Sequence, residues 1–225
     1  MRDLGKKYIR IGIILLAIFI EFTALVRIVD VKAVGVGASD LGFATINTDV
    51  FGFLGVSSFW HTVTDVLGFV ALAVAAAFAL LGLCQLIKRR SLKRVDSPIL
   101  MLGALYIAVI IFYVFFEIVV INYAPIVIDG EPAASYPSSH TLLVVTVMTS
   151  AITVFNSYVK KRVYRIAAAA FSFSVIGLTV VGRLLAGVHW LTDIFASLIL
   201  SAALIVLFFG GLELTSPKSE ADEEH

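Results

Sequence analysis

Two histidines, an aspartate and an arginine stand at spacings that suit phosphoryl transfer. Arg183 is followed by His189 and then by Asp193, while His140 lies further towards the N-terminus. Residues four apart share one face of an α-helix, so we expect the Asp193 carboxylate to reach the His189 imidazole. A positioned imidazole can act as nucleophile or proton carrier, and an arginine fork binds phosphate oxygens. These four residues are therefore candidates for a phosphoryl-transfer site.

The residues just before His140 add a second feature that suits phosphate. Pro137 and Ser138 fit the start of a helix, since proline tolerates a missing N–H there and serine caps the first turn. Free N–H groups at a helix N-terminus bind phosphate, and the hydroxyls of Ser138 and Ser139 would add donors. The alternative interpretation is an ordinary capped helix without a ligand.

The rest of the chain is too apolar for a soluble domain. Of 225 residues, 60% are hydrophobic and 15% are charged, with a mean hydropathy of +1.02, whereas soluble domains are roughly half apolar and a quarter charged. A bilayer span needs about 20 apolar residues, and six segments qualify: 8–29, 60–87, 97–121, 140–159, 164–185 and 189–213. We expect an all-α, six-helix transmembrane bundle forming one domain over residues 1–214. A polar, disordered cytoplasmic tail is expected at 215–225.

The distribution of lysine and arginine predicts how the bundle is oriented. These residues gather before the first span, at 88–94 and at 160–165. Because cytoplasmic loops carry the excess of positive charge, both termini are expected in the cytoplasm of a plasma or inner membrane. His140, Arg183, His189 and Asp193 then share the outer face. The glycine- and phenylalanine-rich segment 30–59 is expected to form an interfacial or re-entrant flap there.

These motifs resemble those of the type-2 phosphatidic acid phosphatases, the membrane relatives of vanadium haloperoxidases. The family pattern Pro-Ser-Gly-His matches at residues 137–140, with serine in place of glycine. The pattern Ser-Arg-x5-His-x3-Asp matches at residues 182–193, with glycine in place of serine. The resemblance implies that His189 is the nucleophile, that Asp193 orients it and that His140 carries the proton. It further implies phosphate binding by Arg183, Ser138 and Ser139, without a metal or other cofactor.

The family's first motif, Lys-x6-Arg-Pro, is where this sequence departs from the pattern. Counting back from Pro125, the arginine position holds Ala124 and the lysine position holds Glu117. Both phosphate-binding cations are thus missing, and one position has the opposite charge. Glu117, and the pair His61 and Asp65 at the start of the second span, are candidates for binding the lipid headgroup instead.

We therefore expect a metal-independent phosphoric ester hydrolase that forms a phosphohistidine and acts on a lipid phosphate in the membrane. One alternative is a lipid phosphotransferase or phosphodiesterase resembling the sphingomyelin synthases, because a phosphodiester carries less charge and needs fewer cations. The other is an inactive lipid-binding or scaffold protein, favoured by the loss of the two cations. No nucleic-acid partner is expected, and the sequence does not indicate an oligomeric state or name the lipid.

Overall fold

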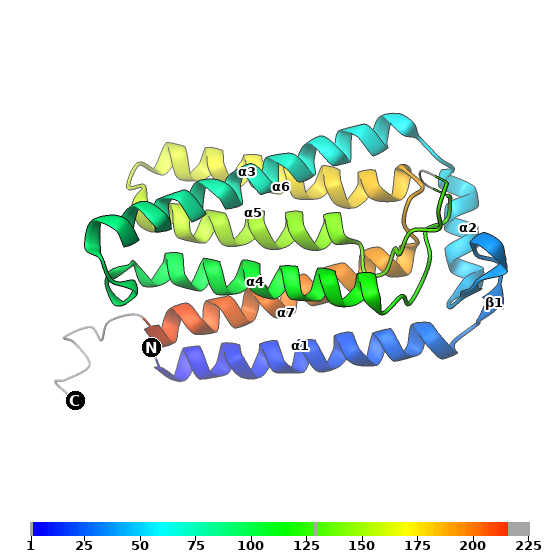
Figure 1. Ribbon diagram of the computed structural model, residues 1–225, viewed down its shortest axis with the longest axis horizontal. Helices are drawn as coiled ribbons and strands as arrows, with labels where there is room; N and C mark the ends of the chain where they lie inside the picture. The colour runs from blue at the N-terminus through cyan, green and yellow to red at the C-terminus, as the bar shows by residue number, and fades with distance from the viewer. Residues whose placement is uncertain (1, 128–129, 216–225) are drawn as a thin grey trace.

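Six long helices lie side by side and make up most of the protein (Figure 1). The computed structural model describes residues 2–127 and 130–215. The long helices are α1 (Arg2–Ile28), α3 (Ser58–Arg89), α4 (Ser97–Ile118), α5 (Ser139–Tyr158), α6 (Arg162–Leu185) and α7 (Leu191–Thr215). All six are long and apolar enough to cross a membrane. The predicted all-α transmembrane bundle is confirmed, and of the predicted tail only Thr215 lies within the described residues.

Local sequence signals account for several of the helix ends. Ser57 caps α3 by accepting a hydrogen bond from the Trp60 N–H at 3.5 Å, and α3 ends at Arg90, which adopts a left-handed conformation. Pro98 stands in the first turn of α4, where its missing N–H costs no helical hydrogen bond. Ser138 caps α5 through the Thr141 N–H.

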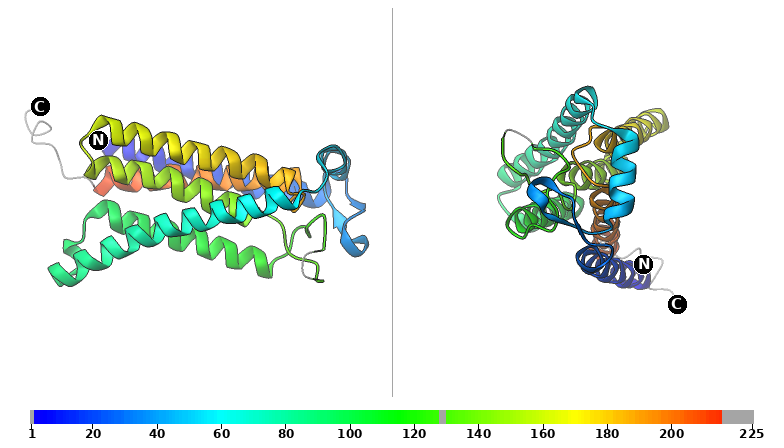
Figure 2. Two further views of the ribbon diagram at one scale, coloured as in Figure 1. Left: turned by 90° about the horizontal axis from the view of Figure 1, so that it is seen from above. Right: turned by 90° about the vertical axis from the view of Figure 1, so that its right-hand side faces the viewer.

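The core of the bundle lies around α5 and α7, the two most buried spans. Helix α1 packs along α7, and α3 runs obliquely across α5 and α6 (Figure 2). Leu142, Leu200 and Leu204 lie in the largest cluster of buried apolar side chains. The outward faces of α1, α3, α4 and α6 carry many exposed leucines, isoleucines, valines and phenylalanines. Such broad apolar exposure matches helices that face lipid.

The segment between α1 and α3 lies across one end of the bundle. It contains β1 (Lys32–Ala33), the 3-10 helix η1 (Val36–Ala38), β2 (Asp40–Leu41) and α2 (Ala44–Leu54), with β1 and β2 paired antiparallel. Asn47 of α2 accepts the Thr192 N–H at 3.2 Å and donates to the Thr192 hydroxyl at 3.0 Å, which ties α2 to the start of α7. The predicted flap is therefore a cap that lies over the helix ends rather than between the long helices.

The opposite end of the bundle carries the basic connection between α3 and α4. This connection includes the 3-10 helix η2 (Leu92–Arg94) and is held by an ion pair of 2.6 Å between Arg89 and Asp96. A hydrogen bond from Tyr158, followed by one from Arg89, lowers the pKa of the Asp96 carboxyl. Helix α1 begins and α7 ends at this basic end (Figure 1).

Candidate active site

The predicted site residues meet at the end of the bundle that the α2 segment covers. His140 lies in the first turn of α5, Arg183 in the last turn of α6, and Asp193 in the first turn of α7. The starts of α5 and α7 and the end of α6 thus bring the sequence motifs to one end of the bundle. The start of α3, with His61 and Asp65, arrives at the same place.

His189 is held in one orientation by a backbone carbonyl. Its Nδ1 lies 3.0 Å from the Ser135 carbonyl oxygen, and its Nε2 lies 3.3 Å from Nη2 of Arg183. A carbonyl only accepts hydrogen bonds and a guanidinium only donates them. The neutral imidazole therefore carries its proton on Nδ1 and presents the lone pair of Nε2 towards Arg183. This is the tautomer that a nitrogen nucleophile requires.

Asp193 supports this arrangement from deeper in the protein. Its carboxylate is fully buried and accepts hydrogen bonds from Asn122 Nδ2 at 3.0 Å and from the Trp190 N–H at 2.9 Å. Its Oδ2 is 3.8 Å from His189 Nδ1, which is beyond hydrogen-bond reach. The expectation that His189 and Asp193 share a helix face is wrong, because α7 begins only at Leu191 and His189 lies in the preceding turn. Gly187, with φ of 70°, makes that turn.

Burial determines the protonation of His189. Desolvation lowers the pKa of the imidazole, and the nearby Arg183 charge lowers it further, while Asp193 opposes both effects. The net shift is downward. His189 is therefore neutral at pH values where a free histidine would be partly protonated.

Arg183 links His189 to the start of α3. Its Nη1 donates to the Thr64 hydroxyl at 3.2 Å and to Asp65 Oδ1 at 3.1 Å. Gly182 allows this approach, because a Cβ at that position would lie 2.6 Å from Cγ2 of Thr64. The serine of the family pattern would therefore clash here, so the glycine substitution reflects the closeness of α6 and α3.

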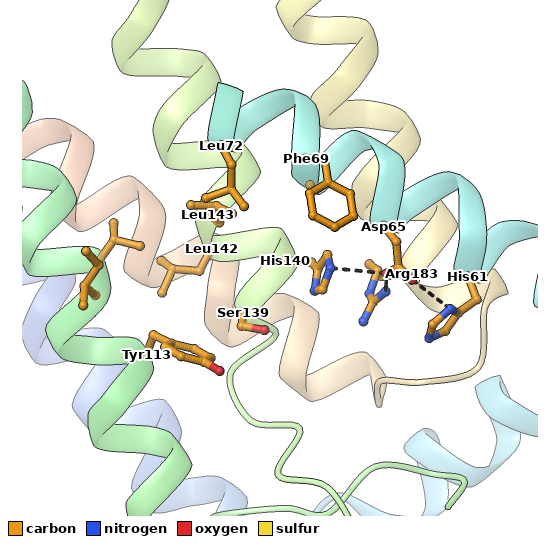
Figure 3. A pocket seen from close by; sticks show the side chains of 13 residues that line it. His61, Asp65, Phe69, Leu72, Tyr113, Ser139, His140, Leu142, Leu143 and Arg183 are labelled. Carbon is orange, nitrogen blue, oxygen red and sulfur yellow. Dashed lines mark hydrogen bonds and ion pairs between the residues drawn. The ribbon is translucent and has the colours of Figure 1, made fainter. Parts of the chain in front are cut away.

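Asp65 occupies the centre of the polar cluster (Figure 3). Its Oδ1 lies 3.1 Å from Arg183 Nη1 and 3.3 Å from His140 Nε2, and its Oδ2 lies 3.0 Å from His61 Nδ1. Gly68, one turn along α3, leaves room for the His140 ring, since a Cβ there would lie 3.0 Å from Cδ2 of His140. One carboxylate thus contacts both the arginine predicted to bind phosphate and the predicted proton carrier.

The cluster forms the polar end of a cavity of about 590 Å³. His61, Asp65, His140 and Arg183 line one side of it, together with Ser139. The remaining wall is largely apolar and comes from α3, α4 and α5, through Phe69, Leu72, Val109, Ile110, Tyr113, Leu142 and Leu143 (Figure 3). A polar end joined to an apolar wall suits an amphiphilic ligand.

The two serines before His140 have different surroundings. Ser139 lines the cavity, whereas the fully buried Ser138 hydroxyl caps α5 and donates to the Thr141 hydroxyl at 3.1 Å. The capping alternative therefore describes the Ser138 side chain. Its backbone has a further function, because the Ser138 N–H donates to the Asp193 carbonyl at 3.2 Å.

The two positions of the degenerate first motif lie apart from the cavity wall. Glu117 is exposed on α4 and borders a separate small cleft beside Tyr113 and Ser139. Ala124 is buried, so an arginine there would have to displace its neighbours. Of the residues that line the main cavity, as far as the structure describes the chain, Arg183 is the one lysine or arginine. A headgroup-binding role for Glu117 stays a prediction.

Two contributors to the site were not predicted from sequence. Ser135 acts through its backbone carbonyl, and Asn122 acts through its side chain from the loop between α4 and α5. Asn122 is polar and lies next to an apolar span, which is a signal that sequence reasoning can use. The Ser135 contact depends on the path of the main chain and has no side-chain signal.

The fold and the gathered residues are similar to those of membrane proteins of the PAP2 superfamily. Residues 119–213 match the sequence model of the PAP2 superfamily, and this stretch contains His140, Arg183, His189 and Asp193. The predicted resemblance is thereby confirmed, and the protein is an integral membrane protein. Asp65 and His61 lie outside the matched stretch.

Comparison with other proteins adds one structural relative. No curated protein matches the chain. Among solved structures, the fold is similar to that of a transmembrane PAP2-type phosphatidylglycerolphosphate phosphatase from Bacillus subtilis. The TM-score is 0.64 at 15% identity, covering 92% of this chain and 98% of that chain. At this level of identity the likeness establishes a common fold.

Proposed function

We propose that the protein is a membrane lipid phosphatase that hydrolyses a lipid phosphate ester through a phosphohistidine at His189. The observation that carries the proposal is the fixed tautomer of His189, whose unprotonated Nε2 faces Arg183 at 3.3 Å. An arginine beside this nitrogen would hold the phosphate where the lone pair can attack. The apolar wall of the adjoining cavity would take the lipid part of the substrate.

In the first step, His189 Nε2 forms a bond to phosphorus and the bond from phosphorus to the lipid oxygen breaks. His140 gives its Nε2 proton to the departing alkoxide. In the structure this nitrogen faces a carboxylate oxygen of Asp65, which only accepts, so the hydrogen lies on Nε2. To act as the general acid, His140 must also carry a proton on Nδ1, so that it starts as the imidazolium and becomes neutral when it gives up the Nε2 proton.

In the second step, His140 takes a proton from water, and the water oxygen attacks phosphorus. The bond from phosphorus to His189 breaks, which releases phosphate and restores the imidazole. Arg183, the Ser139 hydroxyl and N–H groups at the start of α5 stabilise the charge on the equatorial oxygens. Asp193 stabilises the positive charge that the His189 ring gains, and the proposed reaction uses no metal.

The orientation is part of the proposal. The end with the basic 88–94 and 160–165 segments is assigned to the cytoplasm, together with both termini. The cavity and the α2 cap then lie at the outer face of a plasma or inner membrane. A lipid of the outer leaflet would reach the cavity between α3 and α4.

The test is turnover by purified protein in mixed detergent and lipid micelles. Phosphatidic acid, an isoprenyl diphosphate and phosphatidylethanolamine are offered separately, and phosphate or headgroup release is measured. An acid-labile phosphoenzyme should form on the wild type and be absent from His189→Ala. Absence of both turnover and phosphoenzyme with every lipid would refute the proposal and favour a lipid-binding or scaffold protein.

A lipid phosphotransferase or phosphodiesterase is the second candidate. The observation that favours it is the Asp65 carboxylate, which offsets the charge of Arg183 within the anion site. A site with so little net positive charge suits a phosphodiester better than a doubly charged monoester.

A further inference from the structure

We propose that Asp65 determines the substrate class by occupying the phosphate-oxygen position, and that it selects a phosphodiester whose headgroup carries an ammonium group. This inference deepens the second candidate function, the phosphotransferase or phosphodiesterase, and rests on the proposed phosphohistidine chemistry for its catalytic part. It is carried by the geometry around one carboxylate and by the charges of the residues that line the cavity.

The Asp65 carboxylate lies where an oxygen of a bound phosphate would lie. Asp65 Oδ1 lies within 3.1 Å of Arg183 Nη1 and 3.3 Å of His140 Nε2. A phosphate oxygen that bound the same arginine and faced the same proton carrier would take this place. Asp65 is thus an internal anion that the substrate has to displace, and its negative charge remains beside the substrate afterwards.

The charges around the cavity disfavour a doubly charged phosphate. In the resting site, before His140 is protonated for catalysis, the charges of Arg183 and Asp65 cancel in the cavity, and buried Asp193 adds one negative charge behind His189. A dianionic phosphate monoester would meet a displaced carboxylate without a second cation to balance it. A phosphodiester brings one negative charge fewer, and an attached ammonium group would pair with the displaced carboxylate.

The exposure of the polar side chains indicates where a headgroup would lie. The Asp65 side chain is 35% exposed and His61 is 37% exposed, so the polar end of the cavity opens to solvent, whereas Arg183 is 6% exposed. His61 Nδ1, 3.0 Å from Oδ2, anchors the other oxygen of the carboxylate on the open side. This places the lipid chains along the apolar wall, the phosphate at Arg183, and the headgroup beside Asp65 and His61.

The decisive variant is Asp65→Asn, which keeps the shape of the side chain and removes its charge. Relative turnover of phosphatidylethanolamine and phosphatidic acid is measured at about pH 8, where a phosphate monoester is a dianion. Wild type should prefer phosphatidylethanolamine. Because the carboxylate is partly exposed, its removal should shift the ratio towards phosphatidic acid by up to about fivefold. Asp65→Glu retains the charge and should retain the preference.

Two further variants separate this effect from general changes in charge. Asp49→Asn removes an exposed carboxylate on α2, away from the cavity lining, and should leave the ratio unchanged. Glu117→Gln removes the other candidate headgroup-binding carboxylate. A shift of the ratio with Glu117→Gln and none with Asp65→Asn would overturn the proposal.

A binding experiment keeps the inference testable without turnover. Thermal stabilisation of the detergent-solubilised protein is measured with glycerol 3-phosphate, a dianion, and with glycerophosphoethanolamine, a diester that carries an ammonium group. Wild type should bind the diester more tightly, and Asp65→Asn should gain up to about fivefold in affinity for glycerol 3-phosphate. Equal affinities in wild type, or no gain in the variant, would refute the role of Asp65. Loss of turnover with the binding pattern intact would refute only the proposed catalysis.

Discussion

Replacing Asp193 with asparagine tests how the protein stabilises charge on His189. The carboxylate is fully buried and its Oδ2 lies 3.8 Å from His189 Nδ1. When His189 binds phosphorus, its ring becomes positively charged. Coulomb's law gives an attraction of about 4 kcal/mol at this distance for an effective dielectric constant of about 20, which sets the upper limit on what the charge contributes.

We expect Asp193→Asn to lower kcat by about a hundred- to a thousandfold, since about 1.4 kcal/mol corresponds to a factor of ten. Activity should not vanish, because the Ser135 carbonyl still holds the tautomer of His189. The variant should also lose about 1–3 kcal/mol of stability. Both carboxylate oxygens accept hydrogen bonds, from Asn122 and from the Trp190 N–H, and the new amide places a donor against one of these donors.

Asn122→Ala is the matched control for the loss of stability. It removes one hydrogen bond to Asp193 and leaves the charge in place, so it should destabilise the fold to a similar degree while lowering kcat by no more than about tenfold. Rates are measured in mixed micelles, beside thermal unfolding in detergent. If Asp193→Asn keeps kcat within about threefold of wild type, the buried charge does not stabilise the phosphorylated ring.

The remaining predictions concern the two histidines, their protonation and the topology. His189→Ala and His140→Ala should each abolish turnover at nearly unchanged folded yield, and a wild-type rate in His189→Ala would contradict nucleophilic catalysis. Because burial lowers the pKa of His189, activity should persist as the pH falls through about 6.5 and should decline only below that range. Folding stability should already decrease over the same range, because His189 binds a proton in the unfolded chain and not in the folded one. A pH–rate profile recorded beside unfolding curves checks both. In a Cys84→Ser background, an impermeant thiol reagent should label Glu131→Cys in intact cells and should not label Lys93→Cys; the reverse pattern would contradict the orientation.

The fold was predictable because a bilayer restricts the choices. Backbone groups in hydrocarbon must be satisfied within a helix, so length and hydropathy alone locate the spans. The even number of spans and the basic loops then place His140, Arg183 and His189 at one end. The shape of the α2 cap was less predictable, because its docking depends on single contacts such as those between Asn47 and Thr192.

The site was predictable only where side chains carry the chemistry. The spacing of His61 and Asp65 drew attention to α3, but sequence does not reveal that Asp65 reaches Arg183 and His140. That contact depends on how closely the helices pack, which the glycines at 68 and 182 permit. The pairing of His189 with Ser135 is a main-chain contact, and periodicity arguments do not detect it.

The hydrogen bond between the Ser138 N–H and the Asp193 carbonyl has a consequence for how such a protein can change over evolution. Ser197 reinforces it by donating to the carbonyl oxygens of both residues. The spacing between the two halves of the candidate site is therefore held mainly by the main chain, which most side-chain substitutions leave unchanged. Helix α3 makes its polar contacts with the site through side chains, namely Thr64 and Asp65 against Arg183 and His140. The sequence of α3 can thus change to suit a new substrate while the other residues of the candidate site keep their positions. Exchange of the first turns of α3 between relatives is therefore a direct way to redesign selectivity.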